Sequence, residues 1–526
     1  MKKSKTQTLL LELPLAVNAV QAKRLRAHFE AARCLYNALL GEAARRLHRM
    51  RSALGWQAAS AIPRAQKQER NAAFSRLRQE YGFSEYAMHA FAKEARCSWI
   101  ADHIDSVMAQ TLATRAYQAV NRMCLGKARK VRFKSKGRGL DSVENKCNDM
   151  GLRFKLQRPE EGKHGTLIWG NDRISAIIDW NDPVVKHGLS CHIKYARIIR
   201  RNASSPQAKG ADCQGYRYYV QLILEGKPYQ KPKNAPGSGI IGLDLGPSTI
   251  AIVPRQVKAQ LVPLCEELAP DARARRRLQR KLERQRRANN PANYDTKGRV
   301  KKHGKRRSVW KNSKGYLATR RRLAHQERKL AAHRKSLHGR LVNEIVRIGN
   351  QVHIEKISYR GWQKRYGRSV GLHAPGMFME HMRRTVASTG GTLNEVPTRT
   401  TKLSQYCHGC GRYAKKPLSQ RWHQCSCGIG PVQRDLYSAF LAAYLHPPDS
   451  IPSIAHEQWE GAELRLRAAV EVLQQRAKEG QVLPRSVGIS RAGARLPKSL
   501  ATAQLGLIYQ RGRLEALEQE QEPPAL

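Results

Sequence analysis

The sequence predicts a multidomain α+β protein, because its 526 residues fall into three parts with different residue patterns. An N-terminal part carries apolar residues at helical spacing. A middle part contains short runs rich in β-branched and aromatic residues, which are typical of strands. The remainder alternates buried strands with strongly basic helices and contains one cluster of cysteines. A chain of this length can fold as several domains.

The N-terminal part begins with a weakly alternating stretch at residues 5–13, which we interpret as a strand. Apolar residues at helical spacing predict a long helix from 17 to 54, and further helices are expected at 65–81, 84–99 and 104–126. Between 152 and 224, runs such as TLIWG and YRYYVQLIL predict a β-barrel-like module that the first strand closes. Residues 228–239 are dense in Pro, Gly and Lys, as expected of a linker.

The second half begins with IIGLDLGPSTIAIV (240–253), which predicts a buried strand, a turn and a second strand. QVHIEKI (351–357) and TLNEVP (392–397) predict two more strands. Helices are expected at about 376–389, 434–445 and 458–478.

The charge of the chain favours a polyanionic partner. Lys and Arg number 96 against 41 Asp and Glu, for a formal net charge of +55. Residues 271–340 alone carry 26 cations and 4 acids, too few acids to neutralise the helices internally. A solvated basic surface is the alternative, but we expect nucleic-acid contact. The candidate contacts are Arg276, Arg277, Arg280, Lys281, Arg284, Lys301, Lys302 and Arg306, together with Lys127, Lys130, Arg132 and Lys134 of the stretch KARKVRFKSKGR.

Three features favour a cytoplasmic protein without a membrane partner. No apolar run approaches the ~20 residues that a bilayer span needs. The basic N-terminus is followed by a short apolar stretch that Glu12 and Pro14 interrupt, unlike a signal peptide. The 11 cysteines are odd in number, and only four of them cluster, which indicates one metal site in a reducing compartment.

Those four cysteines, Cys407, Cys410, Cys425 and Cys427, form C-x2-C and, fourteen residues later, C-x-C. Four thiolates at this spacing can close a tetrahedron around Zn2+. C-x-C is tighter than the usual C-x2-C, so His408 or His423 remains an alternative fourth ligand. We expect the zinc to be structural, because the segment is too short and polar to fold by burial alone.

Three acids form the candidate catalytic set. Asp244 and Glu355 each lie inside an apolar run, where a carboxylate costs free energy unless it is paired or metal-bound. Asp435 opens a predicted helix just after the cysteines. The alternatives are salt bridges for the strand acids and a helix-dipole interaction for Asp435.

Brought together on a sheet, these carboxylates could bind two Mg2+ ions, because Mg2+ prefers oxygen ligands. Two ions about 4 Å apart can activate a water and stabilise the leaving 3′ oxygen of a phosphodiester. Basic regions lie on both sides of the acids in the sequence. We therefore predict a phosphodiesterase in which Asp244, Glu355 and Asp435 are both catalytic and magnesium-binding. Tyr359 and Trp362 either flank its substrate strand or pack in the core.

The order of these motifs resembles a known family. IGLDLGPSTIAIV precedes a basic helical pair with RRRLQRKLERQRR, and HIEKIS, TRTTKLSQYCHGCG, CSCG and QRDLYSAFLAAY follow in that order. This order is similar to the split RuvC nuclease and zinc ribbon of TnpB proteins and compact type V CRISPR effectors. The resemblance extends over about 238–446, is fainter over 1–230 and does not include 447–526.

The resemblance implies an RNase H-like (RuvC) mixed α/β nuclease core at 238–400 and 431–446, with an inserted zinc ribbon at 401–430. It also implies a wedge-like β-barrel at 1–15 and 127–230 and a helical recognition lobe at 16–126, which leaves 447–526 as a partly helical C-terminal tail. The implied function is that of an RNA-guided, Mg2+-dependent DNA endonuclease leaving 5′-phosphate ends, with a guide RNA and double-stranded target DNA as partners. A transposase acting directly on transposon ends and a guided repressor with an idle metal site remain alternatives.

Overall fold

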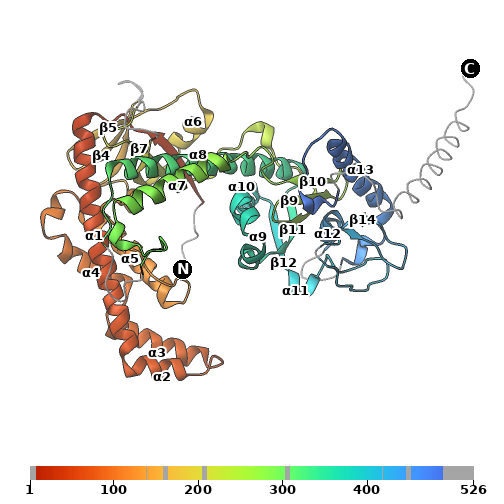
Figure 1. Cartoon of the computed structure of the whole chain (residues 1–526), viewed down its shortest axis with the longest axis horizontal. Helices are drawn as coiled ribbons and strands as arrows, with labels where there is room; N and C mark the ends of the chain where they lie inside the picture. The colour runs from red at the N-terminus through yellow and green to blue at the C-terminus, as the bar shows by residue number, and fades with distance from the viewer. Residues whose placement is uncertain are drawn as a thin grey trace, which may run out of the picture. The chain divides into compact units, whose positions relative to one another are not determined.

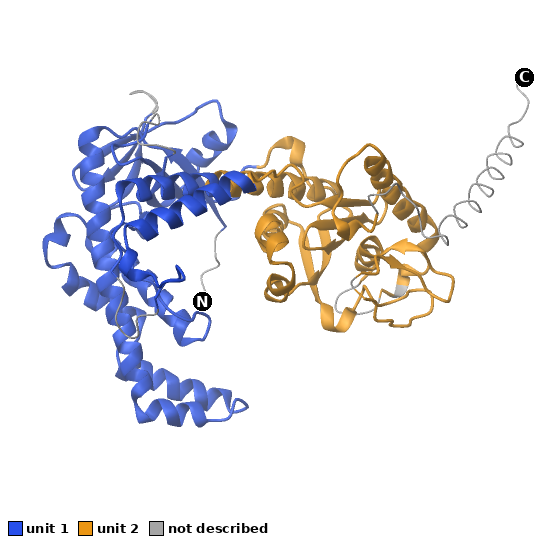
Figure 2. Ribbon diagram, in the orientation of Figure 1, with its two compact units in different colours: residues 1–229, 272–327 blue, residues 230–271, 328–526 orange. Residues whose placement is uncertain are grey.

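The computed structural model describes residues 7–137, 139–157, 164–203, 210–301, 309–417, 419–445 and 452–489. Two predicted nucleic-acid contacts, Lys302 and Arg306, lie outside these residues. The chain forms two compact units (Figures 1 and 2). Unit 1 comprises Met1–Tyr229 and Ala272–Glu327, and unit 2 comprises Gln230–Asp271 and Arg328–Leu526. The protein is thus a multidomain α+β chain, and the finer domain boundaries stay predictions.

Unit 1 begins with β1 (Thr8–Pro14) and a series of helices close to the predicted ranges. Asn18 and Gln21 form a capping box that starts the first long helix. Ser84 and Asp105 cap two later helices by accepting a hydrogen bond from a backbone N–H. The helices are α1 (Ala19–Ser52), α2 (Leu54–Ala61), α3 (Lys67–Glu80), α4 (Glu85–Arg96), the 3-10 helix η1 (Trp99–Asp102) and α5 (Ser106–Cys124).

The β part of unit 1 consists of two antiparallel sheets, in the strand orders β1-β7-β6-β2 and β3-β4-β5. The first strand pairs with β7 along its whole length, and Leu15, just beyond it, bridges to Ala176 at the end of β5. β1 therefore links the two sheets. The bounds are β2 (Ser142–Glu144), β3 (Arg153–Leu156), β4 (Gly165–Trp169), β5 (Asp172–Ala176), α6 (Pro183–Ser190), β6 (Ile193–Asn202) and β7 (Tyr216–Glu225).

One hydrophobic core joins the helical and β parts of unit 1. It contains Phe29 and Leu35 of α1 together with Trp169 of β4 and Leu222 of β7, all almost fully buried. The basic helix α7 (Ala272–Ala288), the 3-10 helix η4 (Pro291–Asn293) and the first half of α8 (Lys314–Ile348) also belong to this unit. α8 then continues into unit 2.

Unit 2 is built on a mixed five-stranded sheet in the order β10-β9-β8-β11-β12. β8 pairs antiparallel with β9, and β9 with β10, whereas β8, β11 and β12 run parallel. The bounds are β8 (Ile240–Leu245), β9 (Thr249–Pro254), β10 (Gln260–Pro263), β11 (Gln351–Lys356) and β12 (Thr392–Pro397).

Helices cover both faces of this sheet, so its strands are apolar on both sides. Alternate residues of β8 and β11, such as Leu243 and Ile354, pack with the end of α8 and with α10. The opposite face packs with α12 and α13. The bounds are α9 (Tyr359–His373), α10 (Pro375–Ser388), α11 (Thr398–Thr401), β13 (Trp422–His423), β14 (Val432–Gln433), α12 (Arg434–Ala443) and α13 (Trp459–Lys478), with 3-10 helices η3 (Pro232–Asn234), η5 (Ser453–Ala455) and η6 (Arg485–Val487).

The segment beyond α12 packs into unit 2. Trp459, Leu466 and Leu473 of α13 and Val487 of η6 are buried in one cluster with Phe440 of α12. Arg465 of α13 also donates to the backbone carbonyl of Arg255, just after β9. Of the helices within the described residues, none has the length and apolar character required to cross a membrane.

Candidate metal centres and nucleic-acid interface

Two of the predicted acids lie side by side at the ends of adjacent strands. In the parallel pairing of β8 with β11, Leu243 lies opposite Ile354, so Asp244 and Glu355 follow as the next neighbours. Because side chains alternate along a strand, both acids point away from the core that Leu243 and Ile354 enter. Both are half-buried on the face that α12 covers.

Gly242 allows the third acid to approach the other two. A Cβ atom at this position would lie 1.9 Å from the carbonyl oxygen of Ala439 and 2.4 Å from the backbone N of Ala443. The backbone of α12 therefore rests directly on β8, and His353 of β11 lies 3.1 Å from the Ala442 carbonyl through its Nδ1. Asp435 stands in the first turn of this helix.

The electrostatics of the three acids show that they influence one another. Burial is the main cause that raises the pKa of Asp244 well above its ordinary range, and the carboxylates of Asp435 and Glu355 raise it further. Burial also raises the pKa of Glu355 and that of Asp435, where the guanidinium of Arg434 opposes the shift. A carboxyl group in these surroundings is stabilised by a bound proton or by a bound cation.

Arg434 connects the acids to the cysteine segment, a role that its position in the sequence does not reveal. Its side chain is largely buried, with Nε 3.6 Å from Oδ1 of Asp435. Its Nη1 donates hydrogen bonds to the backbone carbonyls of Gln420, at 2.8 Å, and Pro417, at 3.3 Å. One guanidinium therefore contacts both Asp435 and the turn that precedes β13.

The donor set suits hard divalent cations, because it consists of carboxylates. Asp244, Glu355 and Asp435 are therefore the residues that could hold such a cation here.

A cavity of about 430 Å³ opens beside Asp244 and Glu355. Lys356, Ser358, Trp362 and Arg399 also line it, whereas Asp435 does not. Lys356 and Arg399 are exposed. The half-buried Trp362 packs edge to face on Tyr359 with ring centroids 6.0 Å apart. The cavity thus combines carboxylates, cations and one aromatic face.

The four predicted zinc ligands come together in unit 2. Sγ of Cys407 lies 3.6 Å from Sγ of Cys427, and Sγ of Cys410 lies 3.6 Å from Sγ of Cys425. Tetrahedral Zn2+ with Zn–S bonds of about 2.3 Å requires sulfur atoms about 3.8 Å apart. Hydrogen bonding, first from the backbone of Cys427, lowers the pKa of Cys425 to about 6, whereas burial raises the pKa of Cys407 to about 12. A bound cation would favour the thiolate form of both. The cluster is consistent with a structural zinc site.

The two histidines considered as alternative ligands have other neighbours. Nδ1 of His408 lies 2.8 Å from the hydroxyl of Tyr437 in α12, and Nδ1 of His423 lies 2.7 Å from Nζ of Lys416. The ring of His423 stacks on Tyr437 with centroids 4.1 Å apart. These contacts pack the cysteine segment against α12, and the four thiols form a group that could hold a metal ion.

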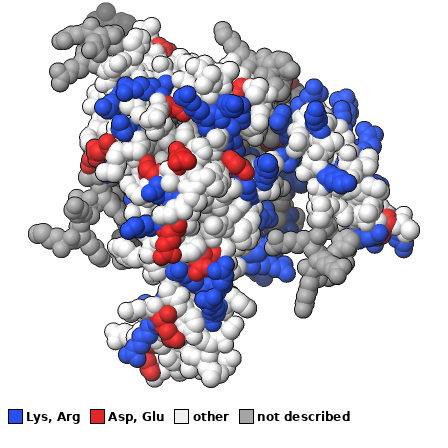
Figure 3. All heavy atoms as spheres, turned by 90° about the vertical axis from the view of Figure 1, so that its left-hand side faces the viewer, with Lys and Arg blue, Asp and Glu red and all other residues white. Residues whose placement is uncertain are grey.

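The predicted basic contacts on α7 are exposed. They are Arg276, Arg277, Arg280, Lys281 and Arg284. The ion pairs of this helix, Arg275 with Glu327 and Arg286 with Glu283, use other cations. Lys301, after η4, is exposed as well. Figure 3 shows Lys and Arg side chains spread over the face of the molecule that it draws, with Asp and Glu interspersed. α7 therefore presents unneutralised positive charge.

The second basic stretch follows α5. Lys127, Lys130 and Arg132 are exposed. The backbone of Lys134 is fixed to α1, because its N–H donates to Asn37 and its carbonyl accepts from Asn37 and Arg33. This anchoring holds a row of cations along the surface of unit 1.

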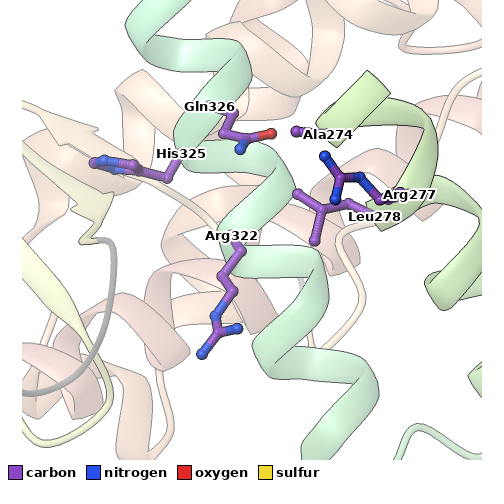
Figure 4. A pocket seen from close by; sticks show the side chains of 6 residues that line it. All are labelled: Ala274, Arg277, Leu278, Arg322, His325 and Gln326. Atoms are coloured by element: carbon purple, nitrogen blue, oxygen red, sulfur yellow. The ribbon is translucent and has the colours of Figure 1, made fainter. Parts of the chain in front are cut away.

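A second cavity, of about 470 Å³, lies between α7 and the first half of α8. Figure 4 shows its lining: Ala274, Arg277 and Leu278 of α7, with Arg322, His325 and Gln326 of α8. It is therefore a cation-lined groove on the basic helical pair.

Neither a family model nor a curated protein matches the sequence. Among solved structures, the chain is similar to the cryo-EM structure of the Cas12f1–sgRNA–target DNA complex, with a TM-score of 0.44, and to that of a CRISPR-Cas12f ternary complex, with a TM-score of 0.24. Each match has 11% sequence identity and covers 84% of this chain and 99% of the other. The chain thus has a structural match to Cas12f over 84% of its length.

Proposed function

We propose that this protein is an RNA-guided, Mg2+-dependent DNA endonuclease whose metal ligands are Asp244, Glu355 and Asp435. The observation that carries the proposal is the pairing of β8 with β11, which sets two carboxylates side by side beneath the helix of the third. The carboxylates of Asp435 and Glu355 both raise the pKa of Asp244, which supports a shared cation site. We also propose that the sheet of unit 2 is the RNase H-like nuclease core and that the two sheets of unit 1 form the wedge.

Once bound, two Mg2+ ions would supply the charge that activates a water and stabilises the leaving 3′ oxygen of a phosphodiester. The residues of the chain would orient the substrate. Lys356 and Arg399 line the cavity beside Asp244 and would attract the phosphate backbone. Trp362 would offer its ring face to an unpaired base.

The proposed partners are a guide RNA and double-stranded target DNA. The exposed cations of α7 and of residues 127–134 support binding to a polyanion. The order of the sequence motifs supports guided DNA cleavage in particular, with base pairing reading the target and the protein reading a short flanking motif.

The test uses the full-length protein purified with its bound nucleic acid. We expect it to copurify with RNA and to cleave a matching plasmid only with Mg2+. Asp244→Ala is expected to abolish cleavage and retain DNA binding, while Asp149→Ala, which removes an exposed carboxyl group in unit 1, keeps both.

Three outcomes would contradict the proposal, each in a different way. Wild-type protein that binds the plasmid but never cuts it would indicate a guided repressor. Cleavage with sequence preference by RNA-free protein would argue against the guide. Joining of transposon ends in a strand-transfer assay would indicate a transposase.

A further inference from the structure

The segment that leads into the cysteine cluster donates two hydrogen bonds to one oxygen of Glu355. The hydroxyl of Thr401 donates to Oε1 of Glu355 at 2.7 Å, and the backbone N–H of Leu403 donates to the same oxygen at 3.0 Å. Both hydrogen bonds therefore converge on Oε1. They fix the rotation of the carboxylate about its last bond.

A buried backbone turn positions both hydrogen-bond donors. Thr401 is only 1% exposed and is the last residue of α11. Lys402, which follows, has φ 42° and ψ 43°, a left-handed conformation that lysine seldom adopts. This residue turns the chain so that the N–H of Leu403, itself 1% exposed, meets the same carboxylate oxygen as the Thr401 hydroxyl.

The Thr401 hydroxyl has a choice of acceptors, and the geometry favours Glu355. Its other neighbour is the carbonyl of Pro397, at 3.3 Å. A hydroxyl carries one proton, and the contact to the carboxylate is 0.6 Å shorter. Bonds to an ionised acceptor are also the stronger kind. The hydroxyl therefore acts mainly on Glu355.

We propose that Thr401, together with the Leu403 N–H, is a positioning element that holds Oε1 of Glu355 and leaves Oε2 to bind the divalent cation. The inference rests on the proposed function of the acid site. Groups that orient a metal-binding carboxylate from behind typically change metal affinity or activity about 10–100-fold when they are lost. Because Thr401 lies six residues before Cys407, the same short segment serves both the acid site and the cysteine cluster.

The experiment measures metal binding without DNA, using Mn2+ as the probe and electron paramagnetic resonance of unbound Mn2+ as the readout. Thr401→Val replaces the hydroxyl by a methyl group of similar size. We expect it to weaken Mn2+ binding about 10–100-fold and to raise the Mg2+ concentration for half-maximal cleavage by a similar factor. Thr401→Ser restores the hydroxyl and is expected to restore most of the affinity.

Two further variants keep the test decisive. Thr400→Val makes the same chemical change one residue away, at an exposed hydroxyl that donates to the Pro397 carbonyl, and is expected to bind Mn2+ as the wild type does. Thr401→Ala removes the hydroxyl without a new methyl group against the carboxylate, so it replaces Thr401→Val if that variant does not fold.

The inference is overturned if folded Thr401→Val or Thr401→Ala binds Mn2+ with wild-type affinity, even when its melting temperature is lower. Asp244→Asn separates this failure from a failure of the proposed function. If Asp244→Asn loses Mn2+ binding while the Thr401 variants keep it, the acid site stands and the positioning role falls. If Asp244→Asn also keeps it, the metal site itself is wrong.

Discussion

Adding one methyl group at Gly242 is expected to disable cleavage by pushing α12 away from the sheet. In Gly242→Ala, the new Cβ would lie 1.9 Å from the carbonyl oxygen of Ala439, whereas real Cβ atoms essentially never come within 3.0 Å of a heavy atom outside their own residue and its chain neighbours. The obstacle is helix backbone, which cannot rotate away as a side chain can. The part of α12 that contains Ala439 and Ala443 must therefore retreat from β8 by about 1 Å, and a helix that moves as a rigid unit carries Asp435 with it.

Two magnitudes follow from this displacement. Overpacking of this kind costs about 1–3 kcal/mol of folding free energy. A misplacement of about 1 Å in a catalytic group lowers the rate on the order of 100-fold. The exposed cations of α7 lie in the other compact unit, so nucleic-acid binding is expected to stay at the wild-type level.

The assay compares cleavage rate, DNA affinity and melting temperature for Gly242→Ala and a matched control. Gly461→Ala, at the start of α13, makes the same change where nothing lies within 4 Å of the added Cβ. Alanine is the better helix former, so the control is expected to be neutral or more stable by up to about 1 kcal/mol. Full cleavage and an unchanged melting temperature in Gly242→Ala would refute the close approach of α12 to β8.

Three further predictions concern the metal centres and the basic helix. Purified protein is expected to contain one zinc per chain by mass spectrometry, and Cys407→Ser to lower both zinc content and melting temperature; zinc-free wild-type protein would contradict this. In the metal-free protein, the raised pKa of Asp244 favours folding at low pH, a contribution that is lost as the pH rises through the folded-state pKa. Added Mg2+ should therefore raise the melting temperature more at alkaline than at acidic pH, and Asp244→Asn should remove that difference; an equal effect across the pH range would speak against it. Replacing Arg276, Arg277 and Arg280 by Gln should weaken duplex binding. The slope of log binding constant against log salt concentration should become less steep by roughly 0.9 per lost phosphate contact, measured by fluorescence anisotropy at several salt concentrations. An unchanged slope would exclude these residues from the interface.

Sequence periodicity located most elements of unit 2 but not all of them. β12 runs over the six predicted residues, and β11 ends one residue before its predicted end. The helix α9 was not predicted. Three glycines within it lower its helical propensity, and Tyr366 has non-helical angles where two helical pieces meet. Hydrogen bonds fix its C-terminal half: Arg334 donates to the carbonyls of Gly371 and Leu372, and the Ser369 hydroxyl donates to the carbonyl of Pro247.

The sequence was enough to predict the acids and cysteines of the candidate site, but not the residues that contact and orient the acids. A single sequence is enough to show acids inside apolar strands and a cluster of cysteines. The acids stand out because burying a carboxylate costs free energy unless it is paired or metal-bound. That these three acids are catalytic stays a prediction. Thr401 gives no such signal, since its contact with Glu355 depends on the left-handed turn at Lys402. Arg434 likewise contacts a turn 14 to 17 residues away in sequence.

The packing of α13 and η6 has a consequence for how the protein is made on the ribosome. The sheet of unit 2 begins at Ile240, yet Trp459 and Val487 complete the cluster that encloses α12. After Asp435 emerges, 52 further residues must be translated before Val487 can join that cluster. At usual elongation rates this takes roughly 3–10 s. Nascent chains therefore pass through an interval in which all three acids are present but the helix that carries the last one still lacks its cover.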